Sequence, residues 1–134
     1  VASDAGEVFD ATVDRLTEMA FCFGLLIYYR DDVICMLLVM LCLSGCLLVS
    51  YSTAKGESLQ LNVPRGMMRR AERAVYLGGA ALLAPMISNF FDPADPHPRF
   101  YLMQGALLLV GLVANATAGY RFYWLYRELK KLGR

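Results

Sequence analysis

Three long stretches of this chain contain no charged residue, and they constrain its fold more than any other feature. They cover residues 33–51, 74–91 and 100–120. A helix needs about 20 mainly apolar residues to cross the hydrocarbon core of a bilayer. The stretches lack the alternation of a barrel strand, and an open sheet would leave unpaired backbone groups in lipid. We therefore predict an all-α protein with one transmembrane helix in each stretch.

A fourth span is predicted over residues 8–29, and its two halves differ. The second half is apolar, whereas the first half carries Asp10, Asp14, Arg15 and Glu18. The whole chain is 57% apolar and 19% charged, whereas soluble proteins average about 25% charged residues. The expected architecture is a polytopic membrane helical bundle of four transmembrane helices.

The basic residues are strongly segregated and predict the orientation of these spans. If both chain ends and the 52–73 connection share one side, that side holds eleven of the thirteen basic residues. The opposite side keeps Arg30 and Arg99. The positive-inside rule makes the first side cytoplasmic, so we predict a multi-pass protein of the cell membrane with its site facing the cytoplasm. The eleven residues are Arg15, Lys55, Arg65, Arg69, Arg70, Arg73, Arg121, Arg127, Lys130, Lys131 and Arg134.

The connections between spans differ in length and composition. Residues 30–32 and 92–99 are short and polar, and the second holds three prolines that oppose helix continuation. Spans 1 and 2, and likewise spans 3 and 4, should therefore form tight antiparallel hairpins. The 52–73 connection is long and basic, and we expect a short interfacial helix near residues 67–72.

Small residues in spans 3 and 4 predict close contacts between helices, because they let two backbones approach. Pro85 is expected to kink span 3. The small residues are Gly78, Gly79, Ala80, Ala84, Gly111, Ala114 and Ala118.

The four cysteines lie in apolar runs, without a CxxC pair or a partnered histidine. This pattern disfavours disulfides and a zinc site, and we interpret these cysteines as small lipid-facing or interhelical residues. They are Cys22, Cys35, Cys42 and Cys46.

Gly6, Asp10 and Asp14 follow one another at intervals of four residues. Each such step turns a helix by about 40° and rises about 6 Å, so the three positions share one stripe. Two carboxylates at the mouth of a span repel each other unless a cation lies between them, and this spacing suits Mg²⁺. Alternatively, acidic residues at a helix start are solvated and interact favourably with the helix dipole. Solvation or packing is the interpretation for the other acids of this region, Asp4, Glu7 and Glu18.

Basic residues of the 52–73 connection and of span 4 form the expected counterpart of this stripe. Guanidinium groups bind phosphate bidentately, so an arginine cluster facing a metal site would bind an anionic substrate. Positive-inside topology and attraction to anionic lipids also explain basic residues, and they suffice for the C-terminal ones. They explain Arg121 less well, because it is embedded among Ala, Gly, Tyr and Phe. The candidates for anion binding are Lys55, Arg70, Arg73 and Arg121.

Two segments resemble the CDP-alcohol phosphotransferases. GEVFDATVD (residues 6–14) matches the closing part of their signature, D-x2-D-G-x2-A-R-x8-G-x3-D-x3-D. YSTAKGESLQLNVPRGMMRRAER (51–73) is similar to the Y-x-x-A-R/K-x-E … R-x-E-R segment of the subgroup that makes inositol-phosphate lipids, with Ala71 replacing a frequent proline. Arg121 lies where that subgroup has another phosphate-binding arginine.

The resemblance covers nearly the whole chain, as the last four of the family's usual six helices. The first two helices and the D-x2-D-G-x2-A-R half of the metal motif are absent, and the chain opens at Val1 within a polar segment. We therefore expect residues 1–134 to be part of a longer CDP-alcohol phosphotransferase domain.

The resemblance implies a metal-dependent enzyme that releases CMP and works as a homodimer. Asp10 and Asp14 would hold Mg²⁺ or Mn²⁺ against the CDP pyrophosphate, with Gly6 allowing the nucleotide to approach closely. Asp14 would also deprotonate the acceptor hydroxyl. The acceptor's phosphate would bind Lys55, Arg70, Arg73 and Arg121.

The implied reaction leaves the donor and acceptor open. We predict transfer of a phosphatidyl-type group from a CDP-linked lipid to inositol phosphate. Within the family, the alternative joins CDP-inositol to inositol phosphate, and glycerol phosphate is a third acceptor. From another class, the alternative is a non-enzymatic four-helix membrane module, although spans 2 and 3 carry no charge that would suggest transport.

Overall fold

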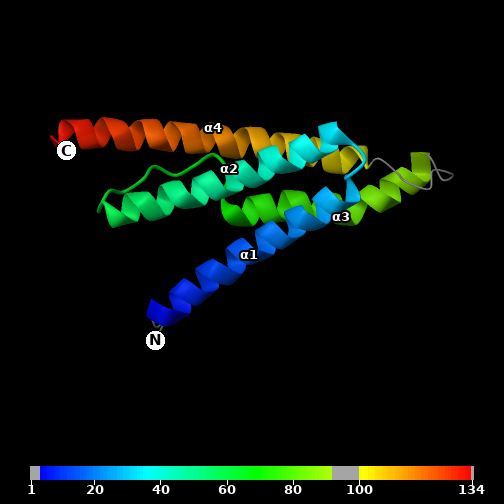
Figure 1. Cartoon of the computed structure of the whole chain (residues 1–134), viewed down its shortest axis with the longest axis horizontal. Helices are drawn as coiled ribbons and strands as arrows, with labels where there is room; N and C mark the ends of the chain where they lie inside the picture. The colour runs from blue at the N-terminus through cyan, green and yellow to red at the C-terminus, as the bar shows by residue number, and fades with distance from the viewer. Residues whose placement is uncertain (1–3, 92–99, 134) are drawn as a thin grey trace.

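The computed structural model describes residues 4–91 and 100–133, and its regular structure within them is helical. Helix α1 covers Asp4–Tyr28 and α2 covers Val33–Ser58; α3 covers Arg70–Phe91 and α4 covers Tyr101–Lys131. The predicted all-α fold is thereby confirmed (Figure 1). The predicted connection 92–99 lies outside the described residues.

Within the described residues, α2 and α4 are long and apolar enough to cross a membrane. Helices α1 and α3 form where spans were predicted, but their crossing of a membrane stays a prediction. Large apolar side chains are exposed on both of them, for example Ile27 and Leu82 at 70% and 77% exposure. Outward-facing apolar side chains of this kind are what a helix in contact with lipid requires.

Helices α2 and α3 begin where side chains can satisfy the free backbone N–H groups of a first turn. The Asp32 carboxylate accepts from the backbone N–H groups of Ile34 and Cys35 at 3.0 and 3.1 Å, which caps α2. The Glu72 carboxylate accepts from the backbone N–H of Arg69 at 2.8 Å and so starts α3 at Arg70. The prediction of a separate interfacial helix at residues 67–72 is therefore wrong, because residues 70–72 belong to α3.

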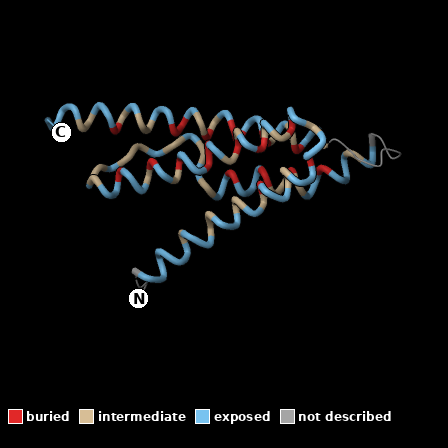
Figure 2. Tube along the Cα trace, viewed as in Figure 1, coloured by how far each residue is buried: buried red, intermediate tan, exposed pale blue. Residues whose placement is uncertain are grey.

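The most extensive helix contact joins α2 and α4, which are not consecutive in the chain. A Cβ added at Gly45 would lie 2.8 Å from Ala114 Cβ, and one at Gly111 would lie 3.2 Å from the backbone N of Cys42. Asn115 Nδ2 donates to the Leu41 carbonyl across this contact at 2.8 Å. Figure 2 shows buried residues gathering along the facing sides of the two helices. The two backbones thus approach each other closely at glycine.

The small-residue prediction is right for most positions and wrong for two. Gly78 and Gly79 have open space where a Cβ would lie, so α3 makes no close backbone contact there. Gly45, which the sequence analysis missed, makes such a contact instead. Pro85 lies inside α3, which changes direction in its second half in Figure 1. The confirmed positions are Ala80, Ala84, Gly111, Ala114 and Ala118, all of which are buried.

All four cysteines are buried free thiols. Cys42 on α2 lies near Cys22 on α1 and near Cys46 one turn further along α2. These thiols therefore fill space between helices, which agrees with the interhelical interpretation of the sequence.

Helices α1 and α2 pack together, and so do α3 and α4, as the hairpin prediction requires. The start of α1, the end of α4 and the 59–69 connection lie toward the same end of the bundle (Figure 1). The connection doubles back along the bundle before α3 begins, and the Leu61 backbone N–H donates to the Gly56 carbonyl at 2.9 Å. This arrangement brings the motif-bearing segments to one end.

Candidate functional site

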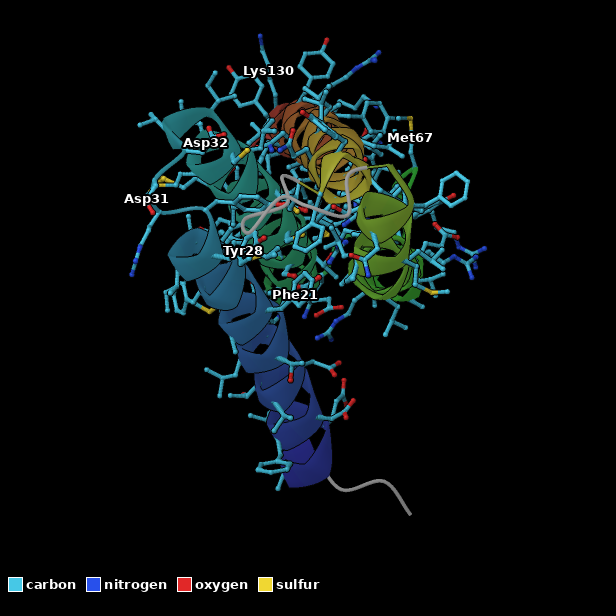
Figure 3. All side chains as sticks on the ribbon, turned by 90° about the vertical axis from the view of Figure 1, so that its right-hand side faces the viewer. Phe21, Tyr28, Asp31, Asp32, Met67 and Lys130 are labelled. Carbon is cyan, nitrogen blue, oxygen red and sulfur yellow. The ribbon has the colours of Figure 1, made fainter. Side chains whose placement is uncertain are left out.

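The predicted acidic stripe lies on the first half of α1. Gly6 and Asp10 are exposed there, and Asp14 lies one turn further toward the bundle. Figures 1 and 3 show this half of α1 diverging from the other helices and extending away from them. The helix therefore places the three motif positions on one accessible stripe.

Asp14 forms an ion pair with Arg70, the first residue of α3. The Arg70 Nη1 group donates to Asp14 Oδ2. The Asp14 side chain is 44% exposed and that of Arg70 is 39% exposed. Because water reaches both groups, this pair contributes little stability and a ligand can replace either partner at low cost. The sequence analysis assigned Asp14 and Arg70 separate roles, and the fold brings the two side chains together.

Glu18 and Arg73 form a second ion pair between α1 and α3, deeper in the bundle. Glu18 Oε1 accepts from Arg73 Nη2 at 3.0 Å and from Arg73 Nε at 3.3 Å. The Arg73 side chain is only 2% exposed and that of Glu18 is 19% exposed. A guanidinium this deeply buried needs a charged partner, because its desolvation costs several kcal/mol. Glu18 therefore supplies the charge that lets Arg73 be buried.

Arg121 lies on α4, opposite the end of α2. Its Nη1 donates to Thr53 Oγ1 at 2.9 Å and lies 3.4 Å from the Val49 carbonyl oxygen. Among the described residues, the buried Nε of Arg121 and the buried hydroxyl of Thr117 have no hydrogen-bond partner. Such orphaned polar atoms are uncommon in folded proteins and are expected to bind water or a ligand.

The 59–69 connection passes directly over Arg121 and Thr117. A Cβ added at Gly66 would overlap with the methyl group of Thr117 and would lie 3.3 Å from Arg121 Nη2. A residue with a side chain at position 66 would therefore displace either the connection or the guanidinium. The absence of a side chain at Gly66 is what lets the connection cover this part of the site.

Electrostatics links the buried Arg73 to the half-buried Arg121. Arg73 and Arg121 are close enough for their positive charges to interact unfavourably, and an anion between them would relieve that repulsion. The fold thus brings Arg121 of α4 near Arg73 of α3, with Arg70 one turn away on α3. Anion binding by these arginines stays a prediction. Lys55 is exposed near the end of α2 and takes no part in these contacts.

The donor atoms on α1 fit part of a divalent-cation site. Within the residues that the structure describes, no group of three or more His, Cys, Asp or Glu side chains is placed to hold a metal ion. Asp10 and Asp14 offer two carboxylates one turn apart on an accessible stripe. Mg²⁺ is commonly bound by one or two carboxylates, with waters and substrate phosphates completing its octahedron. The two aspartates therefore fit such an ion when a phosphorylated substrate supplies further oxygens.

Sequence reasoning missed Glu18, Thr53, Thr117 and Gly66. A signal for Glu18 was present, because it continues the spacing of four that relates Gly6, Asp10 and Asp14. Thr53 and Thr117 gave no local signal, because each meets Arg121 or the connection only after α2 and α4 pack. The environment of Gly66 depends on where the connection crosses α4.

Three curated proteins are similar to this chain. The archaetidylinositol phosphate synthase of Aeropyrum pernix is 39% identical over 88 residues, which are 65% of this chain and 42% of that protein. The enzyme of the same name from Methanothermobacter thermautotrophicus is 27% identical over 125 residues, 93% of this chain and 57% of that protein. The phosphatidylinositol phosphate synthase of Streptomyces avermitilis is 36% identical over 75 residues, 52% of this chain and 30% of that protein.

This chain is a homologue of inositol-phosphate lipid synthases. The resemblance drawn from segments 6–14 and 51–73 is confirmed at that level, and the names of these synthases are consistent with the CDP-alcohol phosphotransferase family. No family model matches the chain, and no solved structure matches it. The chain spans about half the length of the curated relatives that it matches.

The apolar helices α2 and α4 agree with this relationship to synthases named for lipids. Together, the two lines of evidence indicate that this synthase homologue is a membrane protein.

Proposed function

We propose that this protein transfers a phosphatidyl-type group from a CDP-linked lipid to inositol phosphate and releases CMP. The observation that carries the proposal is the contact between Asp14 on α1 and Arg70 on α3. Through that contact, the acidic motif of residues 6–14 meets the basic segment of residues 51–73. The names of the three relatives, archaetidylinositol phosphate synthase and phosphatidylinositol phosphate synthase, support the same type of reaction.

The donor side of the proposed site is the exposed stripe of α1. Asp10 and Asp14 would hold Mg²⁺ or Mn²⁺ against the CDP pyrophosphate, and Gly6 leaves space for the nucleotide on the same stripe. A divalent ion bound there would stabilise the negative charge that develops on the leaving CMP. Exposure of Gly6 and Asp10 keeps this surface open to a large nucleotide-linked donor.

The acceptor side is the group of arginines contributed by α3 and α4. Arg70, Arg73 and Arg121 would bind the phosphate of inositol phosphate, with exposed Lys55 at the rim. The unfavourable interaction between Arg73 and Arg121 supports this assignment, because a dianionic phosphate would offset it. A neutral alcohol would offset nothing, so a phosphorylated acceptor is favoured.

Asp14 is proposed to act as the general base. Arg70 is paired with one carboxylate oxygen of Asp14, Oδ2. The carboxylate becomes a stronger base when Arg70 releases it, and the incoming phosphate offers Arg70 a replacement partner. The acceptor oxygen then bonds to the β-phosphorus of the donor while the bond from that phosphorus to the CMP oxygen breaks. The hydroxyl proton passes to Asp14, which is the step a positioned carboxylate accelerates.

The proposed setting is the cytoplasmic side of the cell membrane, with the protein spanning it several times. The segregation of basic residues toward the end that holds the site supports this orientation. We further propose that the chain corresponds to the last four helices of a six-helix domain, and that the enzyme is a homodimer.

The test follows CMP release by the intact protein in lipid vesicles that contain Mg²⁺ and CDP-diacylglycerol or CDP-archaeol. Release that requires inositol 1-phosphate and stops when EDTA removes the metal is the expected result. Release with inositol alone, or with glycerol phosphate, would contradict the assigned acceptor.

Two other outcomes would redirect the assignment. Release that appears only with CDP-inositol as donor would favour the water-soluble donor of the alternative reaction. No release with any donor would contradict the enzyme and favour a non-catalytic membrane module.

A further inference from the structure

We infer that Glu18 is a positioning residue of the acceptor site, which holds Arg73 in the orientation that phosphate binding needs. The inference rests on the proposed function and deepens it, because it explains how one of the proposed phosphate-binding arginines is fixed. Glu18 lies one turn beyond Asp14 on α1, outside the segment that resembles the family signature.

The geometry of the Glu18–Arg73 pair fixes the plane of the guanidinium. One carboxylate oxygen, Glu18 Oε1, accepts from both Nη2 and Nε of Arg73, at 3.0 and 3.3 Å. Two donors converging on one oxygen restrict rotation of the guanidinium about its stem more than one hydrogen bond would. A guanidinium carries five N–H donors, so the contact with Glu18 leaves donors for a further anion.

Two further groups lie near Arg73. The Cys46 thiol of α2 is close to it. The positive charge of Arg121 on α4 is also near enough to interact unfavourably with it. Without the negative charge of Glu18, the repulsion between Arg73 and Arg121 would drive the two groups apart when no substrate is bound.

The neighbouring pair shows why Glu18 differs from Asp14. Asp14 and Arg70 are both partly exposed and can exchange partners, as the proposed base must. Glu18 and Arg73 are shielded from water, so their interaction is screened less and neither side chain finds an easy substitute. The outer pair is suited to change during the reaction, and the inner pair is suited to persist through it.

The test measures kcat and KM for inositol 1-phosphate in lipid vesicles with the variants Glu18→Ala, Glu18→Asp and Glu18→Gln. Loss of the anchor in Glu18→Ala should raise KM about tenfold while kcat changes less than about threefold, the size expected for losing a charge-assisted contact. Gln keeps the length and an acceptor oxygen but loses the negative charge that holds Arg73, so Glu18→Gln should raise KM nearly as much as Glu18→Ala. Asp keeps the charge but is one methylene shorter, so Glu18→Asp should raise KM by an intermediate factor of about three.

Glu128→Ala is the matched control. Glu128 also pairs with a basic residue, Lys131 at 2.6 Å, but at the exposed end of α4. This variant should leave KM unchanged, and an equal rise in KM would show that any lost ion pair has the same effect and would overturn the inference. If Glu18→Ala fails to insert or fold, Glu18→Asp decides, because a properly folded Asp variant with unchanged KM also overturns it.

A second measurement keeps the inference separate from the proposed reaction. Inorganic phosphate should raise the unfolding temperature of the parent protein by mass action on the anion site, and should raise that of Glu18→Ala much less. If no donor supports turnover but this difference is seen, the proposed reaction fails and the role of Glu18 stands. If turnover requires inositol phosphate but phosphate stabilises both proteins equally, the reaction stands and the role of Glu18 fails.

Discussion

The contact between α2 and α4 and the contact between α1 and α3 are built in opposite ways. Helices α2 and α4 approach backbone to backbone at Gly45 and Gly111, with Asn115 bonded to a carbonyl of the opposite helix. Helices α1 and α3 make no comparably close backbone contact within the described residues. Two ion pairs, Asp14–Arg70 and Glu18–Arg73, connect them instead.

This difference divides the bundle into a closely packed part, α2 with α4, and a part that can rearrange, α1 with α3. Close-packed helices change shape little, because their interior atoms have no free volume to move into. Helices joined through long charged side chains can adjust by exchanging partners. The proposed metal-binding and base residues lie at the adjustable side, which is the α1–α3 contact. Arg121 belongs to the rigid side, which is the α2–α4 contact.

The largest effect on activity is expected when the proposed general base, Asp14, is removed from the α1–α3 contact. Asp14→Asn should lower the rate of CMP release about a hundredfold or more, because a positioned general base contributes at least that much. Membrane insertion and folding should be unchanged, since the Asp14–Arg70 pair is partly exposed. Asp31→Asn, at an exposed acid of the opposite end, is the control and should keep full activity. Unchanged turnover in Asp14→Asn would remove Asp14 from the mechanism.

A smaller effect is expected on the rigid side, at Arg121. Arg121→Ala should raise the KM for a phosphorylated acceptor about tenfold or more, because hydrogen bonds to charged groups contribute about 1.5–3 kcal/mol. Arg127→Ala on the exposed surface of the same helix should change KM little. If neutral alcohols are affected as much as phosphorylated ones, Arg121 does not bind the acceptor's phosphate.

The rigidity itself is tested at Gly45. In Gly45→Ala, the new methyl group would lie 2.7 Å from Asn115 Nδ2 and 2.8 Å from Ala114 Cβ. Overpacking of this kind should destabilise the fold by about 1–3 kcal/mol, measured by thermal unfolding in detergent. Gly105→Ala on α4 meets nothing within 4 Å and should be neutral or slightly stabilising, because alanine favours a helix. Equal stability of the two variants would mean that α2 and α4 are not closely packed.

The smallest effect is expected where the connection meets the rigid side. Gly66→Ala should raise the KM for inositol phosphate about fivefold, because moving Arg121 or Thr117 out of its preferred rotamer costs about 1 kcal/mol. Gly119→Ala, with open space around it on the same helix as Arg121, should not change KM. A Gly66 variant with normal KM would show that the connection moves aside without disturbing the guanidinium.

Much of the fold could be predicted because apolar periodicity and capping act locally. The charge-free stretches located α2, α3 and α4, but α2 and α4 run beyond them to Ser58 and Lys131. An apolar stretch marks the part of a helix that is suited to lipid, whereas the helix continues until its backbone groups find other partners. The interfacial helix was mispredicted because Glu72 caps α3, and composition alone does not show which helix a capping residue serves.

By itself, the sequence determined the helices, the segregation of basic residues and the acidic stripe of Gly6, Asp10 and Asp14, since these depend on spacing and charge. The tertiary structure alone decided which arginine meets which acid, because Arg70 and Arg73 lie more than fifty residues from Asp14 and Glu18. It also decided that Gly45 rather than Gly78 or Gly79 lies at a close helix contact. Small residues permit close approach anywhere, but only the packing of distant helices determines where the approach occurs.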